Sequence, residues 1–217
     1  LFTGYLGKSV VSIYDDKYLD IRNMTSQKMG TASFIVSSNA TLFGNAVLLN
    51  GVSASGVGTI HVNELNNSPS SDLSLLLTDS VLTTFTSDFS FSGNFGKSTV
   101  YVDNNLIITS TAIIGTAQFF NTFSSISGPA TLLSGVSISG TGDVDVTNLE
   151  EKLDAVLSNL TTTIVTTTFG GTQSKTFTGD LGKAFVTVTD TSHMTLSGTT
   201  MGTAVFIVNS DAILTGP

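Results

Sequence analysis

The chain has 217 residues, of which 40% are hydrophobic and only 11% are charged, and its formal net charge is −8. With eight Lys and Arg residues it lacks the cations that displace counterions from a phosphate backbone, which argues against a nucleic-acid partner. The hydrophobic content argues against disorder, and the absence of cysteine excludes disulfides and thiolate chemistry.

Membrane and export signals are missing from the sequence. No stretch reaches the roughly 18 apolar residues that a membrane helix needs, and no basic-then-apolar signal peptide opens the chain. We therefore expect no membrane insertion. The chain starts at Leu1 and stops at Pro217, both inside repeated sequence, so we expect a segment of a longer protein. Low charge and an acidic balance are compatible with an extracellular or cell-surface location.

Tandem repetition is the main organising feature. The stretches Ala46–Val62 and Ala130–Val146 align without a gap at an offset of 84 residues. Two shorter motifs return in the same order. Phe-x-Gly-x-x-Gly-Lys begins at Phe2, Phe91 and Phe177, and x-Gly-Thr-Ala begins at Met29, Ile114 and Met201. We predict two full repeats and a partial one, at residues 1–90, 91–176 and 177–217.

Each repeat predicts the same series of short strands. An alternating apolar strand follows the Gly-Lys motif, then a turn rich in Asp and Asn, a second strand, the Gly-Thr-Ala motif and a more apolar strand. In chain order the expected strands include residues 11–14, 18–21, 34–36, 40–44, 83–91, 100–102, 161–169, 186–188, 194–196, 205–208 and 211–216. The stretch Ala46–Val62 is expected to close the β part of the first repeat.

One segment departs from the β pattern. In Glu151–Leu160 the apolar residues Leu153, Val156, Leu157 and Leu160 have helical spacing, and residues 69–77 are the counterpart in the first repeat. We expect a short helix or a tight loop in both places.

An all-β chain with these features predicts a parallel β-solenoid. A repeat of about 86 residues would supply about four coils of about 20 residues each. Short strands separated by single Gly or Asn residues suit the corners of such coils. The alternative is a series of immunoglobulin-like β-sandwich domains, because about 86 residues is also close to the size of one such domain.

The sequence predicts no catalytic, cofactor-binding or metal-binding residue. His61 in a strand and His193 in a turn lack the neighbouring His, Cys or carboxylate ligands of a metal or catalytic site. Gly140–Asp145 resembles a calcium-binding nonapeptide, but its Asp spacing is wrong and corner glycines explain it better. Calcium at the Asp-rich turns, which contain Asp15, Asp16 and Asp190, is an alternative to simple solvated turns.

Carboxylates and threonines also receive structural interpretations. Glu150 and Glu151 are adjacent, and Asn66 and Asn67 replace them in the first repeat, so we interpret them as a helix-start pair rather than the two acids of a glycosidase. A polysaccharide-active solenoid enzyme remains an alternative. The run Thr161–Thr168 could form a flat Thr ladder, but ordinary strand-forming Thr is favoured.

Two further sets of polar residues stay open to interpretation. The asparagines at positions 23, 39, 66 and 159 begin Asn-x-Ser/Thr glycosylation sequons, which a chain rich in Asn and Thr produces by chance. The lysines at positions 8, 97 and 183 recur in the Gly-Lys motif, where they are expected to form a salt bridge to a neighbouring turn or to cover an apolar corner with their stems.

The segments Phe177–Asp190 and Leu132–Val146 resemble repeat regions of large secreted bacterial surface proteins, such as S-layer-like proteins and giant adhesins. The resemblance implies an exported structural segment that forms a stiff rod, filament or surface lattice through self-association or neighbouring repeats. It implies no enzyme activity and no functional residue. The alternatives are a carbohydrate-binding adhesin or phage tail-fibre shaft, and the polysaccharide-active enzyme.

Overall fold

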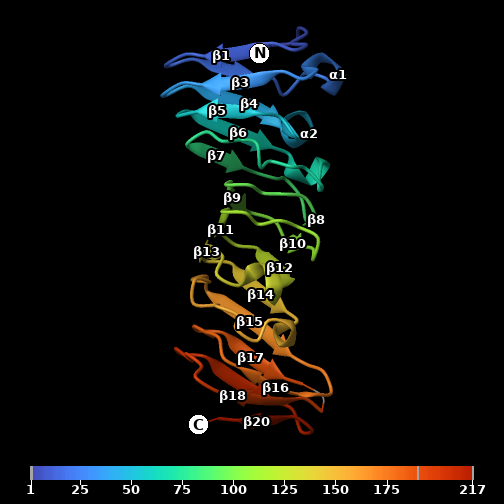
Figure 1. Ribbon diagram of the computed structural model, residues 1–217, viewed down its shortest axis with the longest axis vertical. Coiled ribbons are helices and arrows are strands. Elements are labelled where there is room, and N and C mark those ends of the chain that lie inside the picture. Colours follow the sequence, from blue (N-terminus) through green and yellow to red (C-terminus); the bar gives the residue numbers. More distant parts are fainter. Residues whose placement is uncertain (1, 190, 217) are drawn as a thin grey trace. The chain divides into compact units, whose positions relative to one another are not determined.

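The protein is a parallel β-solenoid in a computed structural model that describes residues 2–189 and 191–216 (Figure 1). Every strand pair with a described register is parallel, for example β4 with β6 and β15 with β17. The solenoid prediction is confirmed. The alternative of immunoglobulin-like sandwiches is wrong, because those domains are built from antiparallel sheets.

The strands are short. In chain order they are β1 (Val10–Ile13), β2 (Tyr18–Asp20), β3 (Ser33–Val36), β4 (Thr41–Asn45), β5 (Ala54–Gly56), β6 (Thr59–Asn63), β7 (Ser80–Thr83), β8 (Phe89–Phe91), β9 (Thr99–Val102), β10 (Leu106–Ile108), β11 (Gln118–Asn121), β12 (Ser125–Pro129), β13 (Ser137–Gly140), β14 (Asp143–Thr147), β15 (Ile164–Phe169), β16 (Ser174–Phe177), β17 (Phe185–Val188), β18 (His193–Leu196), β19 (Val205–Val208) and β20 (Ile213–Thr215). The helical pieces are α1 (Ser26–Met29), α2 (Ala46–Leu49), α3 (Ala130–Leu133) and the 3₁₀ turns η1 (Leu65–Asn67) and η2 (Leu149–Glu151).

The chain divides into two compact units. The N-terminal unit contains Leu1–Asn104 and Thr111–Phe119, and the C-terminal unit contains Asn105–Ser110 and Phe120–Pro217. The predicted repeat boundaries at residues 90 and 176 stay a prediction.

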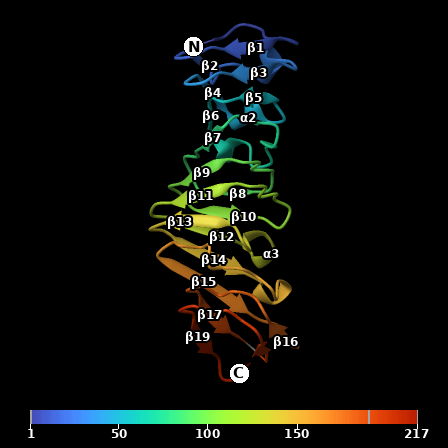
Figure 2. The ribbon, with the colours of Figure 1, turned by 60° about the vertical axis from the view of Figure 1, so that its left-hand side comes forward.

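In the N-terminal unit each coil has three sides. Strands β1, β3 and β5 form one parallel sheet, and β2, β4, β6, β7 and β9 form a second. The third side is irregular, with α1 against α2, α2 against η1, and η1 against β8. Figure 2 shows the strands of this unit lying one beside the next along its length. The inner row Leu42, Ile60 and Val81 is in register and buried, so each coil covers the apolar side chains of its neighbour.

The C-terminal unit follows the same plan. Strands β10, β12, β14, β15, β17 and β19 form one parallel sheet, and β16, β18 and β20 form another. Its inner row includes Val146, Thr167 and Val186, which are register partners and buried.

Equivalent residues of successive repeats adopt the same local structure, which confirms the tandem-repeat character. The turns α2 and α3 lie 84 residues apart, as do η1 and η2. The residue before each 3₁₀ turn, Glu64 or Asn148, is left-handed, with φ of 57° and 55°. One sequence pattern therefore specifies the same corner twice.

The repeat is out of phase with the coil. By position in the repeat, β9 corresponds to β1, yet β1 belongs to the β1-β3-β5 sheet whereas β9 pairs with β7 of the other sheet. In the C-terminal unit β17, the next equivalent strand, likewise pairs with β15. A repeat therefore contains about four coils and one further side. The same strand position therefore lies in a different sheet in each successive repeat.

The Gly-Lys and Gly-Thr-Ala motifs meet at coil corners. A Cβ atom on Gly115 would lie 2.2 Å from the carbonyl oxygen of Gly96, and a Cβ on Gly202 would lie 2.2 Å from that of Gly182. Gly30 and Gly7 make the same contact in the first repeat, at 2.4 Å. Side chains would therefore keep neighbouring coils apart at this corner. This contact explains why the two motifs recur together.

Residues 151–160 form a tight loop beyond η2, so the loop alternative is confirmed and the helix alternative is wrong. The segment has bridges at Val156 and Leu160, and Leu157 and Leu160 are buried whereas Val156 is exposed. The apolar residues of this segment have helical spacing by coincidence, because turn residues and bridged residues follow one another at irregular intervals. The stretch Ala46–Val62, expected to belong to the β part of the repeat, begins instead with the helical turn α2 at Ala46–Leu49.

Candidate functional site

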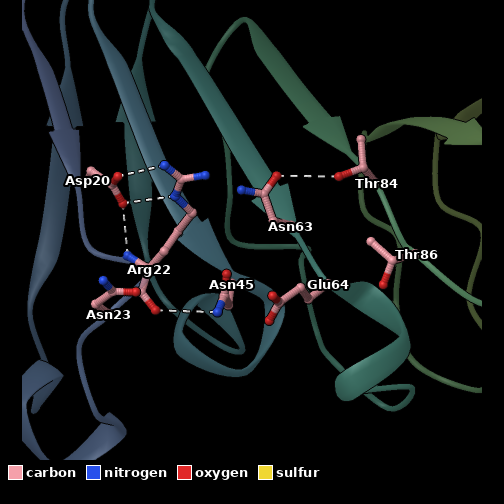
Figure 3. A pocket seen from close by; sticks show the side chains of 8 residues that line it. All are labelled: Asp20, Arg22, Asn23, Asn45, Asn63, Glu64, Thr84 and Thr86. Atoms are coloured by element: carbon pink, nitrogen blue, oxygen red, sulfur yellow. Dashed lines mark hydrogen bonds and ion pairs between the residues drawn. The ribbon is translucent and has the colours of Figure 1, made fainter. Parts of the chain in front are cut away.

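A polar groove runs along one corner of the N-terminal unit. It encloses about 410 Å³ and lies where strands β2, β4, β6 and β7 end (Figure 3). Eight residues line it: Asp20, Arg22, Asn23, Asn45, Asn63, Glu64, Thr84 and Thr86. All eight are polar or charged, so the groove suits a ligand that forms hydrogen bonds rather than one that needs an apolar pocket.

Parallel register builds one wall of this groove. Asn45 and Asn63 are register partners, and Thr84 directly follows the partner pair Val62 and Thr83. Arg22 comes two residues after Asp20, the register partner of Phe43. Four successive coils thus place Arg22, Asn45, Asn63 and Thr84 in a line, which we call the polar row, with about 4.8 Å between coils.

Arg22 is the single arginine of the chain and it is held in place. Its Nη2 and Nε atoms donate to the Asp20 carboxylate at 2.7 Å and 3.0 Å, and its backbone N–H donates to the same carboxylate at 3.1 Å. These hydrogen bonds lower the pKa of Asp20 to about 2. The guanidinium also lies 5.5 Å from the ring centre of Phe43. The cation is therefore fixed at the edge of the groove.

The asparagines of the row are fixed from one end. Asn45 Nδ2 donates to the Arg22 carbonyl at 3.3 Å, and Thr84 Oγ1 donates to Asn63 Oδ1 at 3.3 Å. Among the described residues, no hydrogen bond reaches Asn45 Oδ1 or Asn63 Nδ2. An acceptor and a donor are thus left to face solvent.

An aromatic row lies beside the polar row on the same sheet. The Phe43 ring stacks on His61 at 4.8 Å between centres, and Tyr18 meets Phe43 edge-on at 6.3 Å. Partial burial, together with the nearby Arg22 cation, lowers the pKa of His61 below its ordinary value. The imidazole is therefore neutral at pH 7.

The C-terminal unit has a smaller groove at the equivalent corner. It encloses about 240 Å³ and is lined by Asp145, Thr147, Asn148, Glu150, Thr168 and Gly170. At an offset of 84, Thr147 replaces Asn63 and Gly170 replaces Thr86. The same corner therefore forms with other residues at the positions of Asn63 and Thr86.

Three comparisons with known proteins found no match. No protein-family model fits the chain, and no curated protein or solved structure is significantly similar to it.

The residues weighed from sequence are not brought together in one site. His61 lies in β6 beside the groove. His193 begins strand β18 rather than lying in a turn, and its ring nitrogens meet the hydroxyls of Ser174 at 3.1 Å and Thr215 at 3.0 Å. Within residues 2–189 and 191–216, no group of three or more His, Cys, Asp and Glu residues could hold a metal ion.

The calcium-like stretch is a coil corner. A Cβ on Gly140 would lie 2.1 Å from the Asn121 carbonyl oxygen, and one on Gly142 would lie 2.2 Å from Asn121 Oδ1. Asp16 is left-handed with φ of 59°, as a turn residue is, and Asp15 precedes it in the same exposed turn. Asp190 lies outside the described residues. Calcium at these turns stays untested.

The carboxylates of Glu150 and Glu151 accept hydrogen bonds from different residues. Glu150 accepts from the Gly170 backbone N–H at 3.2 Å, and Glu151 accepts from Asn148 at 3.3 Å. Both lie in the 3₁₀ turn η2, which agrees with a helix-start pair. The second half of the Thr run lies in β15, where Thr166 and Thr168 face outward and Thr167 is buried, so outward Thr alternates with inward residues.

Three of the sequon and Gly-Lys side chains, those of Asn66, Asn159 and Lys183, form hydrogen bonds with backbone groups. Asn66 Oδ1 accepts from the Thr86 N–H at 3.1 Å, Asn159 Nδ2 donates to Gly135 at 3.1 Å, and Asn39 is left-handed. Lys183 Nζ donates to the Thr162 carbonyl in the neighbouring coil. In the part of the chain that the structure describes, the Gly-Lys lysines form no ion pair.

None of the described helices is long and apolar enough to span a membrane.

Sequence reasoning missed the polar groove. The sequence contained one signal, the single arginine two residues after an aspartate. The other lining residues come from four coils, and only the register places them side by side.

Proposed function

We propose that the chain is a structural, non-enzymatic segment of an extracellular repeat protein, whose stacked coils form a stiff rod, filament or surface lattice. One observation carries this proposal. The same backbone contact between neighbouring coils recurs in all three repeats, at Gly30, Gly115 and Gly202. A chain that stacks identical coils can be lengthened by adding repeats, and its length then scales with repeat number.

Backbone hydrogen bonding supports a mechanical role. Coils are joined by parallel ladders and by corner bonds such as Thr116 N–H to Gly96 and Thr203 N–H to Gly182, both at 2.8 Å. A rod built in this way resists bending because backbone bonds and inner apolar rows connect neighbouring coils within each unit.

Self-association is the partner interaction we propose. In the C-terminal unit Phe185, Val205 and Ile207 lie on the outer faces of β17 and β19, and each is between 41% and 52% exposed. Phe185 and Val205 are register partners, so they form a continuous apolar patch. Such a patch favours lateral contact between copies.

The test adds repeats while keeping the phase of the coils. Variants would contain one, two or three further copies of residues 91–176, inserted directly after residue 176. At about 20 residues and 4.8 Å per coil, each inserted repeat should lengthen the particle by about 20 Å. Small-angle X-ray scattering of monomeric fractions measures this, and negative-stain imaging at high concentration shows whether fibres or lattices form.

Chains that fold compactly instead of stacking on one axis would give a different series of radii of gyration. The radius of gyration of compact chains would rise only from about 17 Å for the natural length to about 23 Å with three inserted repeats. Stacking on one axis predicts more than about 30 Å for the longest variant, since a thin rod has a radius of gyration of its length divided by the square root of twelve. A series that follows the compact values would refute the proposal.

A further inference from the structure

We propose that the polar groove of the N-terminal unit binds an uncharged saccharide. The inference concerns a site on the side of the coils and stands apart from the proposed mechanical role. It rests on the chemistry of the eight lining residues and on comparison with the equivalent groove of the second repeat.

The groove offers donors and acceptors in alternation. Arg22 presents a guanidinium, Asn63 Nδ2 is a donor without a partner among the described residues, and Asn45 Oδ1 is an acceptor without one. Glu64 uses Oε2 to accept from Asn67 at 3.2 Å and leaves Oε1 as an acceptor. Figure 3 shows these side chains spread across the coils, with Thr84 and Thr86 at the end away from Asp20. Neighbouring sugar hydroxyls need both kinds of partner at once.

The lining side chains are pre-organised. Asp20 holds Arg22, the Arg22 carbonyl holds Asn45, and Thr84 holds Asn63. Binding therefore costs little side-chain entropy, which matters for a weakly binding ligand. The polar row advances by one residue for each coil, a step close to the length of one pyranose ring, so an extended oligosaccharide can meet successive coils.

Charge selects a neutral ligand. Arg22 is compensated by Asp20, which leaves the Glu64 carboxylate as the uncompensated charge of the groove. A sulfated or sialylated sugar would be repelled by that carboxylate, and one carboxylate is too few to hold a cation. The aromatic row of Tyr18, Phe43 and His61 beside the groove provides an apolar edge for the C–H groups of a sugar.

The fold does not require these side chains. In the second repeat the polar row becomes Thr109, Pro129, Thr147 and Thr168, and the adjoining Phe43 and His61 become Ser127 and Asp145. The corner keeps its 3₁₀ turn and its left-handed residue. The equivalent corner of the second repeat is therefore a natural comparison, with a groove of about 240 Å³ instead of 410 Å³.

The experiment measures binding of the whole chain to defined sugars. The probes are neutral tetrasaccharides of glucose, mannose, galactose and N-acetylglucosamine, with sialylated and sulfated tetrasaccharides as charged comparators. Saturation-transfer NMR detects binding and titration gives the dissociation constant. The double variant Asn45→Ala and Asn63→Ala should bind the preferred neutral sugar about tenfold more weakly, because two hydrogen-bonding groups are lost. Thr147→Ala in the equivalent groove should bind like the wild type.

The measurements must separate weaker sugar binding from loss of folding. Unchanged melting temperature and circular dichroism must accompany the weaker binding, and Asn63→Ala alone serves if the double variant unfolds. Binding of no neutral sugar, preference for the charged comparators, or equal loss in Thr147→Ala would overturn it. Because the repeat-insertion series measures length and not binding, failure of one proposal leaves the other standing.

Discussion

Replacing Gly115 by Ala tests whether corner glycines hold the coils together. Gly115 and Gly51 are both exposed, with φ of 63° and 66°. Either substitution puts a side chain into the left-handed region, at a cost of about 1–2 kcal/mol. The loss of unfolded-chain entropy on going from Gly to Ala is also the same in both, so it cancels in the comparison.

Only the surroundings differ. A Cβ on Gly115 would lie 2.2 Å from the Gly96 carbonyl oxygen, which also accepts the Thr116 N–H at 2.8 Å, whereas nothing lies within 4 Å of a Cβ on Gly51. Relieving this clash must move one coil by about 1 Å and weaken that hydrogen bond. Overpacking of this kind adds about 1–3 kcal/mol. We expect Gly51→Ala to destabilise the chain by about 1–2 kcal/mol and Gly115→Ala by about 2–5 kcal/mol.

Urea unfolding followed by far-UV circular dichroism gives the two free energies of unfolding. Both positions lie in the N-terminal unit, so the same transition reports both. If the two variants lose equal stability, the close approach of the coils contributes nothing and the explanation of the recurring motifs is wrong.

Three other substitutions test two buried threonine hydroxyls and one titrating histidine. Thr83 Oγ1 is buried and has no hydrogen-bond partner in the described part of the chain, so Thr83→Val should raise stability by about 1 kcal/mol. At the equivalent position Thr167 donates to the Val146 carbonyl at 2.7 Å, so Thr167→Val should lower it by about 1 kcal/mol. Thermal melts of both variants check the opposite signs, and a shared sign would contradict the assignment. The pKa of His61 is lowered by burial and by Arg22, so the unfolded chain takes up a proton more readily, and stability should fall as pH drops below about 6.5. Melting temperatures between pH 7.5 and 5 should fall less in His61→Gln, and an equal fall in both proteins would show that His61 is not responsible.

The sequence predicted most of the strands for a simple physical reason. Alternation of apolar and polar residues reports which side of a strand faces a core, as in β3 and β17, and it needs no knowledge of the partner strand. At residues 151–160 it left a short helix and a tight loop as alternatives, because an irregular coil side happens to match helical spacing. It also missed α2, because four residues are too short to show a helical period.

The groove was harder to predict than the strands. Its residues Arg22, Asn45, Asn63 and Thr84 lie on four coils, and the steps between them, 23, 18 and 21 residues, are unequal. No fixed spacing in the sequence marks them as neighbours. Only the register of β4, β6 and β7 brings them into one row.

The amino-acid sequence by itself determined that this chain is an all-β tandem repeat with glycine corners, since repeated motifs and strand alternation are local properties. The tertiary structure decided how the repeat fits the coil. Because about 86 residues exceed four coils by one side, Leu82 pairs with Thr99 and the next repeat moves to another sheet. The position at which each repeat begins on the coil depends on the lengths of all the turns together. Hydrogen bonding between coils fixes it, and no single motif encodes it.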